Sequence, residues 1–359
     1  MDIIKQPPAT HTAFNPVVLR VAETVAEEIF IGVEKGGNTY ATQAREVING
    51  AAVFDISGAI KRLFELGVED TNPPTDYTLL DGQLAASYTL SIQTTGGETE
   101  SIPIRTAINA VVQVGESSDL TKWGDCLLTG FNKLKKYESY PLGVSFLNNS
   151  QIAYLLFGDE QINASPIEDA HFCISIPNGV SEISFAKSVE SIPIIVAGSQ
   201  LTAATGEPIL ARGKILSEGA VKMEVKQECT PQSPFYVRWI NQKGGRDYWM
   251  FSFRQTIEKS VDNVDTATPF ILDQENAKGF SKVIGLEAEI KATVGAALQG
   301  DEFDTVSNII FSPQIEWYRE DIGKWAQLII DSSSIEKDTR TGGGNIEITF
   351  LLPQIQTQF

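Results

Sequence analysis

Residues 235–253 read FYVRWINQKGGRDYWMFSF. The pair Gly244-Gly245 lies between two runs rich in aromatic and β-branched residues, a pattern typical of a β-hairpin. Alternate side chains of a strand share a face, and one face of this aromatic hairpin carries Phe235, Val237 and Trp239, then Trp249, Phe251 and Phe253. The opposite faces are also substantially apolar, so we expect the hairpin to be buried on two sides.

The aromatic hairpin (residues 235–253) supports three interpretations. A central hairpin in a sandwich core needs apolar residues on both faces. A platform that stacks on sugar rings, or a subunit interface rich in Trp, Tyr and Arg, needs exposed aromatic side chains. The candidate interface or glycan-contact residues are Tyr236, Arg238, Trp239, Arg246, Tyr248 and Trp249.

Length and composition indicate a globular chain with more than one domain. Its 359 residues exceed the roughly 250–300 at which one core stops growing. A hydrophobic content of 42% and a charged content of 21% favour a folded chain over a disordered one. The net charge of −18 disfavours binding to nucleic-acid phosphates and to anionic membranes.

Cysteine use and the N-terminal sequence favour folding in a reducing cytosol. Cys126, Cys173 and Cys229 are far apart and form no Cys-x-x-Cys pair, so neither a disulfide framework nor a structural zinc is expected. The first residues lack the apolar stretch of a signal peptide. The longest apolar runs, such as 192–198, are too short to span a bilayer, so no membrane insertion is expected.

Alternation of apolar and polar residues predicts strands along most of the chain. The clearest example, over residues 84–94, places on one face Leu84, Ala86, Tyr88, Leu90 and Ile92. Turn residues at 35–38, 49–50 and 95–98 separate strands. Short helices are expected after an N-cap at Ser57, ending at Gly67, and over residues 131–137 and 301–310.

These patterns predict a mostly β fold, with two or more antiparallel β-sandwich-like domains and a few short helices. We expect a sandwich-like N-terminal domain with one short helix over residues 1–115. A middle β-rich segment or second domain follows over 116–200. A C-terminal β-rich domain over 201–359 contains the aromatic hairpin.

The sequence lacks the patterns that nucleophilic catalysis and nucleotide binding require. A serine triad needs a proton-shuttling histidine, but only His11 and His171 occur and no Gly-x-Ser-x-Gly elbow is present. We expect structural roles for both, and the nearby Cys173 has no third partner. Six residues separate Gly206 from Gly213, where a P-loop has four between its glycines. We therefore predict no catalytic residue and no cofactor.

Grouped acids leave one enzymatic hypothesis open, because a glycan hydrolase uses a pair of carboxyl groups. The groups are Asp70 with Asp76, Asp273 with Glu275, and Asp301 with Glu302 and Asp304. None has the Asp-x-Asp-x-Asp-Gly order of a calcium loop, so no metal is expected. With 46 acidic residues in the chain, solvated loops explain these groups better.

Several short segments, spread over most of the chain, share a similarity with other proteins. They are residues 14–18, 52–57, 140–142, 235–251, 312–313, 317–318 and 352–356. These segments resemble tail-region proteins of phages and prophages of gut bacteria. The resemblance implies a β-sandwich-based structural subunit in a homo-oligomeric ring, and it identifies no functional residue.

Three functions therefore stay open. The first is a non-enzymatic virion structural protein, a tail or baseplate subunit made in the bacterial host cytoplasm, whose partners are its own copies and other virion proteins. The second is a carbohydrate- or receptor-binding surface module that contacts a host surface glycan. The third is a carboxylate-dependent glycan hydrolase, for which Asp273 and Asp301 are the acids to replace.

Overall fold

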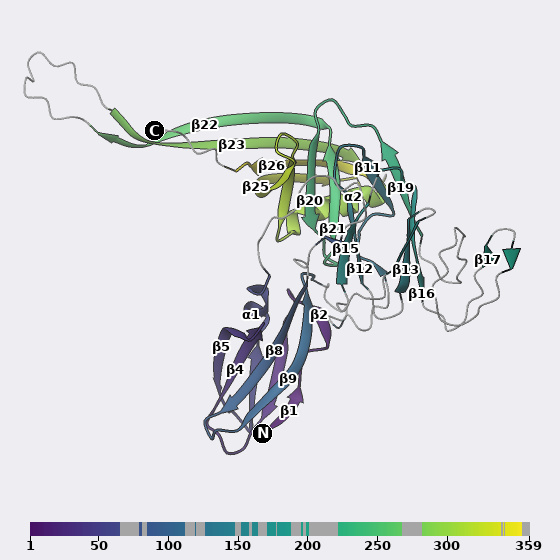
Figure 1. Ribbon diagram of the computed structural model, residues 1–359. Helices are drawn as coiled ribbons and strands as arrows, with labels where there is room; N and C mark the ends of the chain where they lie inside the picture. Colours follow the sequence, from purple (N-terminus) through teal and green to yellow (C-terminus); the bar gives the residue numbers. More distant parts are fainter. Residues whose placement is uncertain are drawn as a thin grey trace, which may run out of the picture. The chain divides into compact units, whose positions relative to one another are not determined.

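The computed structural model describes residues 1–64, 79–80, 85–111, 119, 126–147, 152–157, 160–163, 171–176, 178–187, 195–196, 199–200, 222–267, 282–338, 340 and 342–353. Strands dominate (Figure 1), which confirms the mostly β prediction. Contacts divide the chain into two compact units: unit 1 is 1–230 with 240–248, and unit 2 is 231–239 with 249–359. The predicted boundaries near 115 and 200 lie in or next to stretches outside the described residues and stay predictions.

The N-terminal part of unit 1 is a sandwich of two sheets, with strand orders β1-β3-β6 and β2-β9-β8-β4-β5. Neighbouring strands are antiparallel except for β2 and β9, which are parallel. The bounds are β1 Asp2–Lys5, β2 Thr10–Thr12, β3 Val18–Ala22, β4 Glu28–Lys35, β5 Asn38–Glu46, β6 Ala51–Asp55, β8 Ala85–Thr94 and β9 Thr99–Ile108.

The inward faces of both sheets share one apolar core. On β8 the alternation is as predicted, because Tyr88, Leu90 and Ile92 are buried. The opposing sheet contributes Leu19 and Phe54, which are paired across β3 and β6. The expected turns at 35–38, 49–50 and 95–98 join β4 to β5, precede β6, and join β8 to β9. In the turn at residues 49–50, Asn49 has a φ of 53°.

The predicted N-cap of the first helix is wrong by one residue. Helix α1 spans Ser57–Lys61, its N-cap is Ile56, and no side chain caps it. The Asp55 carboxylate instead accepts hydrogen bonds from the backbone N–H of Ser57, at 3.0 Å, and of Val17, at 3.2 Å. Asp55 at the end of β6 therefore satisfies the N–H of Ser57 itself, while the N–H groups of Ala59 and Ile60 donate to the Ile56 carbonyl oxygen. The expected helix end, Gly67, lies outside the described residues.

The rest of unit 1 contains sheets of strand order β10-β12-β15-β7 and β11-β19-β16-β13-β14, and the pair β17-β18. The bounds are β7 Leu79–Leu80, β10 Cys126–Leu127, β11 Lys133–Tyr137, β12 Gly143–Leu147, β13 Ile152–Phe157, β14 Glu160–Asn163, β15 His171–Ser175, β16 Glu182–Lys187, β17 Ile195–Val196, β18 Ser199–Gln200 and β19 Lys222–Glu228.

The helix predicted over residues 131–137 is wrong, because Lys133–Tyr137 form β11, which pairs in parallel with β19. Leu134 and Lys136 both point inward and are buried. The Lys136 ammonium donates to the Tyr140 carbonyl oxygen at 2.5 Å, and burial lowers the pKa of Lys136 to about 8. A buried lysine hides the period-two pattern, because it puts a charged residue where a core position is expected.

Unit 2 contains most of a seven-stranded sheet of order β21-β20-β24-β25-β26-β23-β22, while Ile240 of β20 and residues 246–248 of β21 belong to unit 1. The bounds are β20 Phe235–Ile240, β21 Arg246–Phe251, β22 Phe253–Ala267, β23 Lys282–Leu298, α2 Gly300–Ser307, a 3-10 helix Asn308–Phe311, β24 Ile315–Arg319, β25 Lys324–Lys337 and β26 Gly344–Leu351. Strand β25 pairs with β24 up to Leu328 and with β26 from Ile329 onward. The helix predicted over residues 301–310 is confirmed, with Asp301 in its first turn.

Phe54 and Val53 are adjacent on β6, but Phe54 is fully buried whereas Val53 is 53% exposed. We expect Phe54→Ala to lower the free energy of unfolding by roughly 3–5 kcal/mol, because it leaves a cavity in the sandwich core. Val53→Ala should change it by less than roughly 0.5 kcal/mol. Urea denaturation of both variants measures this, and equal effects would contradict the assigned faces.

Candidate functional site

The aromatic hairpin is buried on both faces, as the sequence predicts, since every residue of β20 and β21 is buried. The six candidate contact residues have the following exposed fractions: Tyr236 1%, Arg238 1%, Trp239 1%, Arg246 6%, Tyr248 8% and Trp249 9%. Within this chain they therefore form no exposed platform for sugar rings or for a second subunit.

The base of the hairpin packs through aromatic rings within unit 2. Phe235 stacks on Trp317 with a centroid distance of 5.5 Å, and on Phe350 at 5.9 Å. Tyr236 contacts the ring of Trp325 at 5.7 Å. Large ring surfaces removed from water dominate the energetics of such cores. The aromatic rings thus connect β20 to β24, β25 and β26 of the seven-stranded sheet.

A buried ion pair fixes the register of β20 against β24. Arg238 and Glu316 are directly opposite, and the Arg238 Nε donates to Glu316 Oε2 at 2.5 Å. The guanidinium also lies over the Trp325 ring, 4.2 Å from its centroid. Gln314 Nε2 donates to the second carboxylate oxygen at 3.1 Å. Any slip of β20 would leave a charge unpaired in the core, which is costly.

The turn of the hairpin is held by Asn241 and by two glycines within unit 1. Asn241 Oδ1 accepts from the backbone N–H of Lys243 and Gly245, and its Nδ2 donates to the Leu128 carbonyl oxygen at 2.9 Å. Gly244 has a φ of 83°, a conformation that favours glycine. A Cβ on Gly245 would lie 1.8 Å from the Leu128 carbonyl oxygen. The close approach of backbone to backbone therefore requires glycine.

Asp247 is the one strongly perturbed acid of the hairpin. Its carboxylate accepts from the Thr129 hydroxyl at 2.5 Å and from the Gly130 N–H at 3.2 Å. Loss of solvation raises the pKa of Asp247 to about 6, because the hydrogen bonds offset only part of the burial cost. These contacts hold the turn in place, and Asp247 itself is 2% exposed.

His11 has the structural role that the sequence predicts, and it lies in β2, where all three residues are buried. Its Nδ1 contacts the Thr12 carbonyl oxygen at 2.9 Å and its Nε2 contacts the Tyr88 hydroxyl at 2.8 Å. Burial lowers the pKa of His11, so the ring stays neutral with Nδ1 donating and Nε2 accepting.

The remaining candidate groups do not assemble into a site within the described residues. His171 and Cys173 lie on β15, opposite Leu147 and Ser145 of β12. Asp301, Glu302 and Asp304 lie on α2, while Asp70, Asp76, Asp273 and Glu275 fall outside the described part of the chain. Across the part that is described, no three His, Cys, Asp or Glu side chains gather as a metal site, and no helix could cross a membrane.

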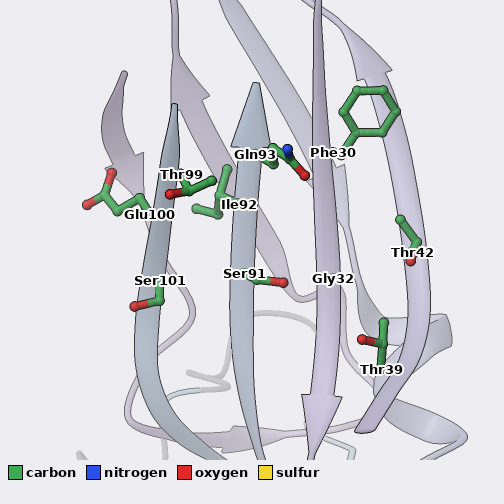
Figure 2. Close-up of a pocket in the computed structure, with 10 residues that line it drawn as sticks. All are labelled: Phe30, Gly32, Thr39, Thr42, Ser91, Ile92, Gln93, Thr99, Glu100 and Ser101. Atoms are coloured by element: carbon green, nitrogen blue, oxygen red, sulfur yellow. The ribbon is translucent and has the colours of Figure 1, made fainter. Parts of the chain in front are cut away.

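The sequence did not predict a hollow of about 420 Å³, which lies on the outer face of the sheet β2-β9-β8-β4-β5. It is lined by β4, β5, β8 and β9 (Figure 2). The outward positions of β8, Ser91 and Gln93, were predictable from the alternation over residues 84–94. The strands that would lie beside them, and hence a hollow, could not be predicted from one strand.

No protein-family model and no curated protein matches the chain. Among solved structures, the chain is similar to one from the virion of a native gene transfer agent particle, at 12% identity and a TM-score of 0.23, covering 34% of this chain and 92% of that one. A tail chain of an empty gene transfer agent particle gives 11% identity and a TM-score of 0.24, with the same coverage. Fibronectin(III)-like modules of Clostridium thermocellum CbhA give 9% identity and a TM-score of 0.17, covering 63% of this chain and 93% of theirs. Scores this low do not establish a shared fold.

The Gly245 contact predicts a steric effect at the hairpin turn. Gly245→Ala should lower the free energy of unfolding by roughly 3 kcal/mol, because the new methyl group overlaps the Leu128 carbonyl oxygen. The matched control is Gly58→Ala in α1, where nothing lies within 4 Å of the new Cβ and a gain of roughly 0.5–1 kcal/mol is expected. Chemical denaturation compares the two, and a neutral Gly245→Ala would contradict the contact.

The raised pKa of Asp247 predicts a pH dependence of stability. Between its ordinary value of 3.8 and about 6, the folded chain holds a proton that the unfolded chain releases, so the contribution of this group to stability falls as pH rises. The Asp247→Asn variant does not lose stability in this way as the pH rises, because an amide does not ionise. Its stability relative to the parent chain should rise on the order of 2 kcal/mol between pH 4 and pH 7. Urea denaturation across this range measures the difference, and a flat difference would contradict the pKa.

Proposed function

We propose that this chain is a non-enzymatic structural subunit of a phage virion, located in the tail region, that assembles with its own copies into a ring. The observation that carries the proposal is a two-stranded arm in unit 2, formed by residues 259–267 of β22 and 282–290 of β23. The segments that resemble phage and prophage tail-region proteins are consistent with it.

The arm follows from the strand register. Strand β23 pairs with β26 only over residues 291–298. Over residues 282–289, β22 is the one strand that pairs with it within the described residues, and at Ile290 the carbonyl oxygen also accepts from the Leu352 N–H. The two strands run side by side beyond the end of β26 (Figure 1). At about 3.3 Å per residue, nine residues extend the ribbon about 30 Å past the third strand.

A two-stranded ribbon is at best marginally stable in water, because it has no third element to bury an apolar face against. Among the described residues no further strand pairs with either edge of this ribbon, and open strand edges can add a strand from another chain. At the base of the arm, Ile257 lies opposite the buried Ala292, yet it is 63% exposed. We infer that a second copy of the chain covers this base and pairs with the arm.

The arm can be removed without disturbing the strands that hold it. Residues 260–289 are excised and Lys259 is joined to Ile290, the residue it faces, through an Asn-Gly turn. We expect the full chain to form an oligomer of defined mass and the excised variant to be monomeric. Light scattering after size-exclusion chromatography gives the masses, and electron microscopy shows whether the oligomer is a ring.

A matched pair of substitutions tests the base of the arm. Ile257→Lys should weaken association, whereas Ile329→Lys changes an equally exposed isoleucine of unit 2 and should leave it unchanged. The near-ultraviolet circular dichroism of the buried tryptophans checks the fold of every variant. A full chain that stays monomeric, or an excised variant that assembles equally well, would contradict the role of the arm. Absence of the chain from purified virions would contradict the virion assignment.

A further inference from the structure

The hollow of unit 1 is built by strand register. Ser101, Ser91, Gly32 and Thr42 face each other in turn across β9, β8, β4 and β5, so four small residues form one row across the sheet. The next outward row contains the larger Gln93 and Phe30, and Figure 2 shows the two rows at successive levels. Small residues beside large ones leave a trough that crosses the strands.

Gly32 forms the floor of this trough. It occupies an outward position in the middle of β4, between the buried Ile31 and Val33. A Cβ at this position would lie 2.5 Å from the Ser91 hydroxyl oxygen. That hydroxyl donates to Glu34 Oε1 at 2.7 Å, so the absence of a side chain at Gly32 leaves room for the Ser91 hydroxyl beside it. A larger residue at position 32 would therefore collide with the Ser91 hydroxyl and take up space in the trough.

The lining has the chemistry of a site for a neutral polyol. Hydroxyl groups come from Thr39, Thr42, Ser91, Thr99 and Ser101, and an amide comes from Gln93. These groups both donate and accept hydrogen bonds, as the hydroxyl groups of a sugar do. The Phe30 ring adds an apolar face of the kind on which a sugar ring packs.

Charge and size narrow the class of ligand. The one charged lining residue is Glu100, and no Lys or Arg lines the hollow, so an anionic ligand would meet repulsion without a counter-ion. The volume of about 420 Å³ lies within the range of small-ligand sites. Four strands span about 14 Å across the sheet, which accommodates a short chain of sugar rings.

We propose that this hollow binds a neutral oligosaccharide, with Phe30 packing on a sugar ring and Gln93, Ser91 and Ser101 bonding its hydroxyl groups. This is a different site from the aromatic hairpin, whose candidate residues are buried. It is also independent of the arm, because the hollow lies wholly in unit 1. The proposed assembly and the proposed glycan binding can therefore be tested, and contradicted, independently of each other.

The test uses the full chain and a panel of neutral hexasaccharides of gluco, manno and galacto configuration, alongside sialylated and sulfated glycans. Isothermal titration calorimetry should detect binding of at least one neutral member. Phe30→Ala and Gly32→Val should each weaken that binding about tenfold or more, because they remove the ring or fill the floor. Tyr40→Ala is the matched control, since Tyr40 is 44% exposed on β5 but lies outside the hollow.

Circular dichroism and thermal melting establish that each variant is folded, and Gln93→Ala provides a third variant if Gly32→Val is not. Binding that Phe30→Ala and Gln93→Ala reduce and Tyr40→Ala preserves supports the site. The proposal is overturned if no neutral member binds, if only anionic glycans bind, or if binding is unchanged in Phe30→Ala and Gln93→Ala.

Discussion

A hairpin buried on both faces must satisfy its polar groups inside the protein, and this constraint shapes both units. In unit 2, Arg238 is matched by Glu316 on the adjacent strand. In unit 1, Asn241 bonds the backbone of its own turn and the Leu128 carbonyl. Burial of the Asp247 carboxylate costs free energy, because its hydrogen bonds from Thr129 and Gly130 do not fully replace those to water. The polar groups therefore set the register, while the aromatic rings supply the buried area.

The two units differ in how they treat strand edges. In the sandwich of unit 1 the apolar faces are covered by opposing sheets, and its outer face carries small polar side chains. In unit 2 the ribbon of β22 and β23 continues beyond its third strand, with Ile257 uncovered at its base. A monomer gains nothing from such an extension, since exposed edges invite unwanted pairing. The proposed assembly rests on this extension of β22 and β23.

Much of the fold was readable from the sequence wherever a local pattern agreed with its surroundings. The alternation on β8 and the two-sided aromatic hairpin are such cases, because burial followed hydrophobicity directly. The pattern misled where a charged group was buried, as at Lys136 in β11, and at the start of α1, where Ile56 is the N-cap and Asp55 accepts from the Ser57 N–H. The hollow was unreadable for a different reason. The row through Gly32 exists only after four strands are aligned, and no single segment encodes that alignment.

The division of the hairpin between the units has a consequence for the order of events during synthesis. Residues 240–248 belong to unit 1, although the rest of that unit ends at residue 230. The Leu128 carbonyl and the Thr129 hydroxyl therefore have no hairpin partners until the ribosome has passed residue 248. Unit 1 is N-terminal in sequence but cannot be completed first as an independent domain. Its last piece arrives together with the beginning of unit 2, so maturation of the two is coupled in time by the chain itself.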